Sequence, residues 1–94
     1  MKIKVQYFAS LRELLNLREE VLDLRDGLDV AAVLTLLAER HGQKLRAYVF
    51  DSAGAPKQHL QFLIDGKSIT TLSGLKSILH DGSAFAIIPP VGGG

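Results

Sequence analysis

The stretch Lys2-Ile3-Lys4-Val5-Gln6-Tyr7-Phe8 alternates between polar and apolar side chains. A period of two predicts a half-buried strand with Ile3, Val5 and Tyr7 on one face. A second apolar stretch, Ala84-Phe85-Ala86-Ile87-Ile88, predicts the last strand of the chain. Because these two strands are the most apolar of the sequence, we expect them at the centre of a sheet.

One long helix is predicted between these two strands. Asp29 is its expected N-cap, apolar residues recur after it at helical spacing, and Gly42 is a fitting residue just beyond its end. Residues 45–50 fit either a short helix or a strand, and residues 52–56 are predicted to form a loop.

Two further strands and two helical turns complete the pattern. Residues 20–24 and 59–64 have the composition of strands, and Asp65-Gly66 after the second of them is a hairpin-turn signal. Ser10 is the expected N-cap of a helical turn over 10–15. The apolar residues within 72–79 predict a second helical turn that packs on the core.

The order of these elements is two strands, a helix, two strands, a short helix and a final strand. It indicates an α+β fold, with a mixed five-stranded sheet and one main helix across one face. If the first and last strands pair in parallel, their connection has to cross over, and the helix supplies that crossover. The expected architecture is the β-grasp, or ubiquitin-like, fold: one domain over 1–90, followed by a flexible tail over 91–94.

The composition excludes several classes of protein. The net charge is +1 over 94 residues, and no basic block indicates nucleic-acid binding. No apolar run reaches the roughly 20 residues that a membrane helix needs, so we expect no membrane partner. The chain has no cysteine, which removes disulfides, thiolate nucleophiles and iron–sulfur clusters. This composition fits a reducing compartment, and we expect a cytoplasmic protein.

The ionisable residues form neither a catalytic nor a metal-binding pattern. His41, His59 and His80 are far apart in the sequence and have no partners at ligand spacing, so we expect no metal site. No Ser–His–Asp order and no paired carboxylates stand out. We therefore expect no catalysis by the chain itself and no bound cofactor.

The last residues, Pro89-Pro90-Val91-Gly92-Gly93-Gly94, carry the strongest functional signal. A proline pair stops a strand because proline lacks an N–H donor. The glycines after it have no side chain that blocks access to the Gly94 carboxylate. Fully extended, residues 91–94 span roughly 13–14 Å, enough to reach a recessed site in another protein. Ordering such a tail costs about 1–2 kcal/mol per residue, so we expect a second docking surface.

The predicted sheet offers that surface on the face opposite the helix. Phe8 and Ile88 each follow an inward-facing residue, so they point to this outer face near the root of the tail. Lys2 and Lys4 share the face, which indicates a partner with an acidic rim. Clustered exposed apolar residues mark interaction sites. The predicted partner-binding residues are Phe8, Leu63, Ala86, Ile88, Pro89 and Pro90.

Three stretches resemble the small subunit of molybdopterin synthase. They are Tyr7-Phe8-Ala9-Ser10-Leu11-Arg12-Glu13-Leu14, the pair Asp81-Gly82, and Ile88-Pro89-Pro90-Val91-Gly92-Gly93-Gly94. More broadly, the chain is similar to the ubiquitin-like sulfur carriers, which include the thiamine sulfur carrier. It departs from the usual pattern at Ser83, Asp65 and Gly92, but not at the final Gly-Gly.

The resemblance implies a sulfur-transfer role for the tail. Gly94 would be adenylated with ATP by a ubiquitin-activating-type enzyme, and a sulfur donor would convert the adenylate into a thiocarboxylate. Val91, Gly92 and Gly93 would then lie in a channel of the large catalytic subunit of molybdopterin synthase, where the sulfur passes to a pterin precursor. The chain would be the non-catalytic subunit of that complex.

Three other functions remain open from the sequence. The same activated carboxylate would serve a ubiquitin-like protein modifier that forms isopeptide bonds to lysines. It would also serve a sulfur carrier for thiamine or cysteine biosynthesis. Finally, the chain fits a plain binding domain with an inert tail.

Overall fold

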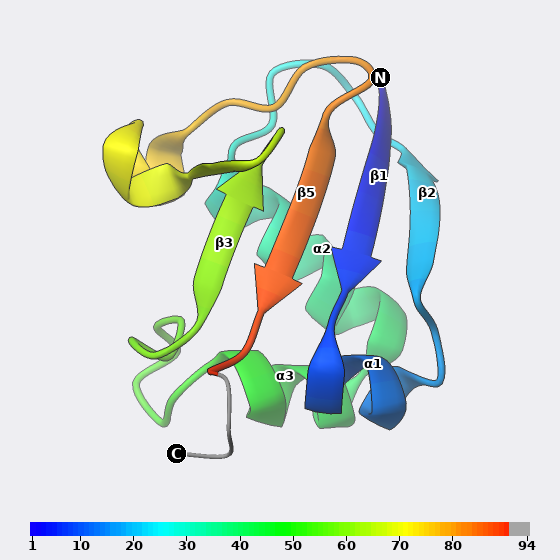
Figure 1. The fold of residues 1–94 in the computed structure, drawn as a ribbon, viewed down its shortest axis with the longest axis vertical. Coiled ribbons are helices and arrows are strands. Elements are labelled where there is room, and N and C mark those ends of the chain that lie inside the picture. Colours follow the sequence, from blue (N-terminus) through cyan, green and yellow to red (C-terminus); the bar gives the residue numbers. More distant parts are fainter. Residues whose placement is uncertain (91–94) are drawn as a thin grey trace.

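The computed structural model describes residues 1–90, in which a mixed five-stranded sheet is covered on one face by helices (Figure 1). The strand order is β2-β1-β5-β3-β4. The strands are β1 (Lys2–Tyr7), β2 (Glu19–Asp23), β3 (Gln61–Ile64), β4 (Lys67–Ser68) and β5 (Ala84–Ile88).

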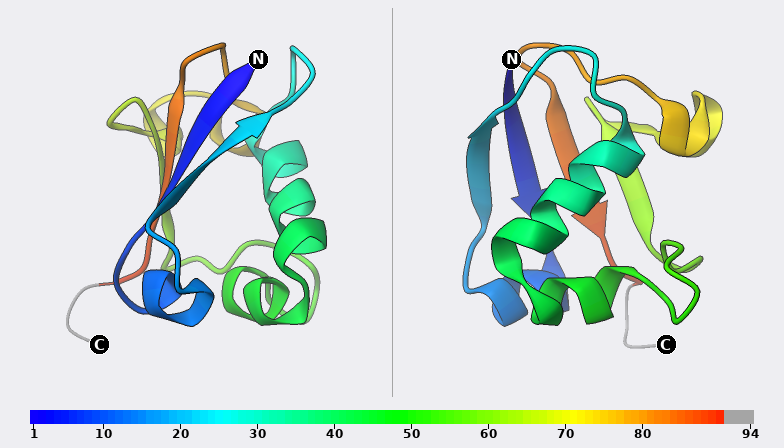
Figure 2. Two further views of the ribbon diagram at one scale, coloured as in Figure 1. Left: turned by 90° about the vertical axis from the view of Figure 1, so that its right-hand side faces the viewer. Right: turned by 180° about the vertical axis from the view of Figure 1, so that it is seen from behind.

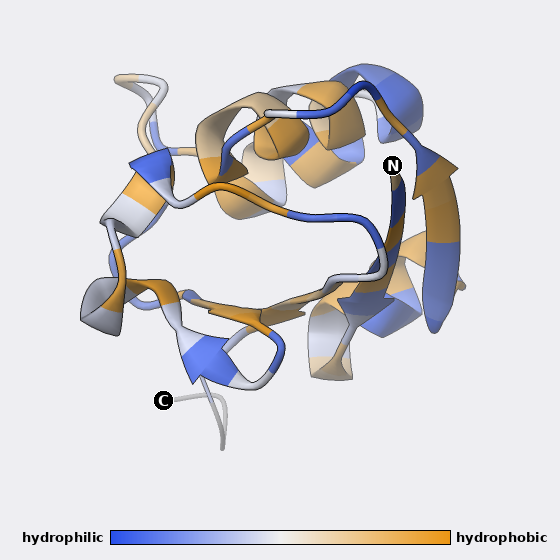
Figure 3. Cartoon of the chain, turned by 90° about the horizontal axis from the view of Figure 1, so that it is seen from above, coloured by the Kyte–Doolittle hydropathy of each residue, from blue (hydrophilic) through white to orange (hydrophobic). Residues whose placement is uncertain are grey.

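The first and last strands pair in parallel at the centre of the sheet, as predicted. Val5 lies opposite Phe85, and Tyr7 lies opposite Ile87. All four side chains are buried and face the helices. We call this side of the sheet the closed face and the opposite side the open face; Figures 2 and 3 show the helices over 30–41 and 43–49 on the closed side. The predicted β-grasp architecture is therefore confirmed.

The main helix across the closed face is α2 (Val30–His41). The Asp29 carboxylate accepts a hydrogen bond from the Ala32 N–H (2.9 Å), so Asp29 is the N-cap. Gly42, with φ of 80°, ends the helix, as expected. The ambiguous stretch after it is helical and forms α3 (Gln43–Val49). No helix within residues 1–90 is long and apolar enough to cross a membrane.

The predicted N-cap of the first helical turn is wrong. The turn is α1 (Ala9–Leu15), and Phe8 occupies the N-cap position without a side-chain cap. Because the chain turns sharply at Ala9, which has a φ of 51°, Ser10 already lies inside the helix. The Ser10 hydroxyl instead lies 2.5 Å from the Tyr48 hydroxyl of α3.

The predicted helical turn over 72–79 is confirmed only in part. A short 3₁₀ turn, η2 (Gly74–Lys76), lies within it, and another, η1 (Ile69–Thr71), directly precedes it. The chain changes direction between and after them, so the apolar positions lose a common face. Of the four residues expected on the core, Leu79 is buried, whereas the exposed ones are Leu72, Leu75 and Ile78.

Candidate docking face and tail base

The tail base, which we define as Ile88–Pro90, is fixed by the central strand of the sheet. β5 pairs in parallel with β1 on one side and antiparallel with β3 on the other. Ile88, its last residue, lies opposite Gln61. Pairing stops at Pro89, which is buried, and Pro90 is exposed. The start of the tail is therefore held by two neighbouring strands.

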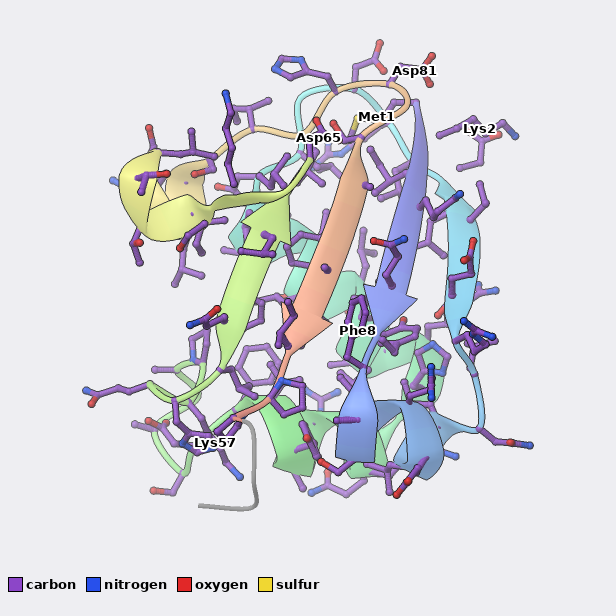
Figure 4. All side chains as sticks on the ribbon, viewed as in Figure 1. Met1, Lys2, Phe8, Lys57, Asp65 and Asp81 are labelled. Carbon is purple, nitrogen blue, oxygen red and sulfur yellow. The ribbon has the colours of Figure 1, made fainter. Side chains whose placement is uncertain are left out.

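The structure places the predicted apolar partner-binding residues together on the open face. Leu63 lies opposite Ala86 in the β3–β5 pair, and Ile88 is two residues further along β5. Phe8 follows β1, and its side chain lies on the open face beside the end of β5 (Figure 4). Phe8 is 39% exposed, so the loop after β1 does not cover it.

These residues differ in how much surface they offer to a partner. Leu63 and Ile88 are half-buried, and Ala86 is buried although it lies outside the core cluster. Ala86 and Pro89 therefore contribute little contact area of their own. Phe8 is the most prominent apolar side chain near the tail base. The predicted tail residues Val91, Gly92, Gly93 and Gly94 lie outside the described residues.

The two lysines of the open face are engaged within the chain. Lys2 Nζ lies 3.1 Å from Asp23 Oδ2, and Lys4 Nζ lies 3.5 Å from Glu19 Oε2. Both carboxylates belong to β2. Because the side chains of both pairs are 50–69% exposed, these surface ion pairs are weak, and the acidic rim stays a prediction.

A cluster of ionisable side chains lies on the closed face, around Glu20. Tyr7 Oη donates to Glu20 Oε2 (2.5 Å), and His41 Nε2 lies 2.5 Å from the same oxygen. Arg40 Nε donates to the other oxygen, Glu20 Oε1 (2.6 Å). Tyr7 and His41 also meet edge to face, with ring centroids 6.0 Å apart. The cluster therefore joins β1, β2 and the last turn of α2.

These contacts shift two pKa values in opposite directions. Burial by itself would raise the pKa of Glu20, but hydrogen bonds from Tyr7, His41 and Arg40 outweigh it and lower that pKa. Burial, reinforced by the hydrogen bond to Glu20, raises the pKa of the Tyr7 hydroxyl well above its usual range. Both carboxylate oxygens of Glu20 are occupied by partners. We interpret the cluster as a structural one.

The sequence gives one signal for this cluster, which the predictions above do not include. Glu20 has the same strand parity as Leu22, so its carboxylate has to face the core side of the sheet. A charge in that position requires partners. The partners themselves come from β1 and α2, and no local spacing indicates them.

The remaining histidines do not contribute to a site. His59 and His80 are exposed. In the part of the chain that the structure describes, no group of three or more His, Asp or Glu residues is arranged to hold a metal ion.

Comparison with known proteins identifies the family. The ThiS family profile matches residues 5–94. The chain belongs to the ThiS family. A "Molybdopterin synthase sulfur carrier subunit" from Chlamydomonas reinhardtii is 31% identical over 94 residues, with both chains fully covered. "Small archaeal modifier protein 3" from Haloferax volcanii is 29% identical, again over the whole of both chains.

The fold of this ThiS-family chain is also similar to that of a solved structure. The crystal structure of SAMP1 from Haloferax volcanii superimposes with a TM-score of 0.87 and 26% identity, and the match covers all of both chains. The family comprises ubiquitin-like sulfur carriers and modifiers. One of the two relatives is thus named as a sulfur carrier subunit and the other as a modifier.

Proposed function

We propose that the chain is a sulfur carrier that acts as the small subunit of a molybdopterin synthase. Gly94 would carry the sulfur as a thiocarboxylate, and the reaction with the pterin precursor would take place in the large catalytic subunit. The chain would supply the reactive end group and a docking surface, but no catalytic residue. The observation that carries the proposal is the position of the Phe8-containing open face directly beside the tail base.

The anchoring of the tail base supports this role. A tail that reaches into a recessed site needs a fixed starting point. If the tail base were mobile, ordering it would add to the entropy cost of insertion. Here the base follows a strand that is paired on both sides up to Ile88. The buried Pro89 then ends the pairing.

The open face supports the second part of the role. The tail has little side-chain surface, so most binding energy has to come from the folded domain. Phe8 combines a large apolar ring with 39% exposure, the combination expected for an aromatic anchor that fills a pocket on a partner. Leu63 and Ile88 extend the apolar surface beside it.

The chemistry at Gly94 would proceed in two substitutions. First, a carboxylate oxygen attacks the α-phosphorus of ATP in an adenylating enzyme, and pyrophosphate leaves. A sulfide equivalent from a sulfur donor then attacks the acyl carbon, and AMP leaves, which gives the thiocarboxylate. A glycine is suited to the second step because it has no Cβ beside the carbon under attack.

A protein modifier is the second candidate, and the Haloferax relative named as a modifier favours it. In that function a lysine amine, instead of a sulfide equivalent, attacks the same activated carbon. Both functions share the adenylation step, so they differ only in the nucleophile that follows. A third use, as a sulfur carrier in thiamine or cysteine biosynthesis, differs only in the protein that accepts the sulfur.

The deciding experiment follows the fate of Gly94. The chain is incubated with ATP, a ubiquitin-activating-type enzyme and a sulfur donor, and its intact mass is measured. We expect the mass change of one oxygen-to-sulfur exchange, and then its reversal when a large synthase subunit and the pterin precursor are added. The matched control is the chain without Gly94, which should show neither change.

Two outcomes would contradict the proposal. If the chain acquires no sulfur, or if it keeps the sulfur in the presence of the large subunit and the precursor, the molybdopterin role is wrong. Immunoblots of cell extracts test the modifier function separately. A ladder of covalent conjugates that disappears when Gly94 is deleted would establish that function instead.

A further inference from the structure

The outer edge of β2 carries backbone groups that no other strand uses. β2 is an end strand of the sheet and pairs only with β1. The Leu24 N–H donates to the Met1 carbonyl, and the Tyr7 N–H donates to the Arg18 carbonyl, both at 2.8 Å. These two bonds show that the even-numbered residues of this strand bond to β1.

The odd-numbered residues of β2 therefore point their N–H and C=O groups to the open edge, since bonded and non-bonded pairs alternate in an antiparallel ladder. These residues are Glu19, Val21 and Asp23. Val21, in the middle, is 58% exposed. An open edge of this kind can accept an additional strand from another chain.

An apolar groove runs along this edge, between β2 and α2. It has two adjoining depressions, and Leu24 and Leu36 line both of them. The lower depression, near the end of α2, also has Leu22 in its lining, with Glu39 and Arg40 at its rim. The upper one is completed by Leu28 and Ala32 together with the polar residues Asp23, Arg25 and Thr35. Leu24, Ala32 and Leu36 are only partly buried, although they pack against the core. We call this feature the β2–α2 groove.

The shape of the groove specifies an extended occupant. A strand added to β2 would direct every second side chain toward α2, and such side chains are about 7 Å apart. Two successive inward side chains would therefore enter the two depressions. The backbone of the occupant would at the same time pair with Val21 at the open edge.

The charges near the upper depression indicate which charge the bound segment should carry at that end of the groove. Asp23 lies 3.1 Å from Lys2, and Asp26 lies 3.4 Å from the N-terminal ammonium. Both carboxylates beside Arg25 are thus compensated. Arg25 lines the upper depression, is exposed, and has no ion-pair partner within residues 1–90. The upper end of the groove therefore favours an acidic residue.

We propose that the β2–α2 groove binds an extended segment of a partner protein as a sixth strand, with two apolar side chains at alternate positions and an acidic residue next to Arg25. This surface is separate from the open face and from the tail base. The groove lies at the outer edge of the sheet, whereas the tail base follows β5 at its centre. Figure 2 shows α2 on the closed side of the sheet, away from the open face. A partner held in this groove leaves the open face and the tail accessible.

The test uses a synthetic peptide in which Val and Ile alternate with Thr and which has Asp at both ends, because a strand can add in either direction. Two-dimensional amide NMR spectra of the isotope-labelled chain are recorded during titration. We expect the largest shifts at Glu19, Val21 and Asp23 and along the groove side of α2. A peptide with Lys in place of Asp should bind more weakly to the native chain, and Arg25→Glu should reverse that preference.

Val21→Pro is the decisive variant. It removes the N–H that would bond to the added strand, and this N–H takes no part in the β1–β2 ladder, so the fold should be kept. We expect the affinity of Val21→Pro for the peptide to fall by about tenfold. Val21→Thr retains the N–H and should bind the peptide like the native chain. Leu36→Glu gives a second, independent test, because it places a charge in the groove without altering the edge.

Three results would overturn the proposal. The first is the absence of shifts at β2 with peptide in the millimolar range. The second is a shift pattern centred on Phe8 and Leu63, which would place the peptide on the open face. The third is unchanged affinity in both Val21→Pro and Leu36→Glu. Sulfur loading of Gly94 should be the same in all these variants, so the two proposals fail or succeed separately.

Discussion

Ile87 and Ile88 are identical neighbours in β5, yet they belong to different faces of the sheet. Ile87 is fully buried on the closed face, whereas Ile88 is half-buried on the open face. The same contrast holds between Tyr7, which is 1% exposed, and Phe8, which is 39% exposed. The closed face holds the fold together, and the open face keeps apolar surface beside the tail base. Strand parity alone assigns each residue to its face.

The sharpest test of this contrast replaces each isoleucine by alanine. Ile87→Ala leaves a cavity in a packed core and should lower the free energy of unfolding by about 2–5 kcal/mol. Ile88→Ala should lower it by about 1 kcal/mol or less, since water already reaches this side chain. Chemical denaturation of both variants measures the difference. Equal losses would show that the open face is as important for stability as the closed one.

Parity also explains how much of the fold the sequence could predict. The alternation over 2–8 and the apolar stretch over 84–88 were sufficient to predict the central strands, and the signals at Asp29 and Asp65-Gly66 to predict the main helix and the hairpin. The wrong prediction at Ser10 and the partly correct one over 72–79 both concern short turns. Their conformation depends on backbone angles such as those at Ala9 and Gly74, which no side-chain pattern reveals.

The candidate site was predictable to a similar extent. The face on which Phe8, Leu63 and Ile88 lie follows from parity, and the structure places them there. The burial of Ala86 could not be predicted in this way, because strand parity gives the face on which a side chain lies but not how far its neighbours cover it. The partners of Lys2 and Lys4 also come from another strand, so the sequence alone did not reveal their ion pairs.

A second prediction tests whether the open face serves binding and not stability. Phe8→Arg should weaken binding to a large synthase subunit more than about tenfold, because it replaces an aromatic anchor by a charge. Stability should change little, since Phe8 is already 39% exposed. The matched control is Val21→Arg. Val21 is also an exposed apolar residue on the open face, but it lies on the end strand β2, away from the tail base. A quantitative pull-down measures both.

If both arginine variants bind like the native chain, the open face near the tail base is not the docking surface. If both lose binding equally, the contact is a broad one that extends to β2. Only a selective loss in Phe8→Arg supports an anchor beside the tail base.

A third prediction concerns the exception to the apolar closed face, Glu20. Because its pKa is lowered in the folded state, the unfolded state binds more protons when the pH falls below the usual glutamate pKa of about 4.3. The stabilising contribution of Glu20 is therefore present above this pH and is lost below it. Glu20→Gln should reduce stability by about 1 kcal/mol at neutral pH and should flatten the acid limb of the stability curve.

Denaturation of the native chain and the variant over a series of pH values measures this effect. The matched control is Glu39→Gln, since Glu39 is exposed and forms no ion pair within residues 1–90. Identical acid limbs for the native chain and Glu20→Gln would mean that the cluster with Tyr7, Arg40 and His41 contributes nothing through the carboxylate charge.

The smallest expected effect lies at the turn between the two faces. Ala9 has a φ of 51°, a left-handed conformation that costs an L-residue roughly 1–2 kcal/mol, and this turn leaves Phe8 on the open face. Ala9→Gly removes the strain but adds about 0.5–1 kcal/mol of unfolded-chain entropy, so the net gain should be about 0.5 kcal/mol. Ala31→Gly, at an exposed position within α2, should instead destabilise by about 1 kcal/mol. A higher denaturation midpoint for Ala9→Gly and a lower one for Ala31→Gly, each relative to the native chain, would establish that the turn after β1 is held in a strained conformation by the packing of α1. Lower midpoints in both variants would show that Ala9 is an ordinary helical residue.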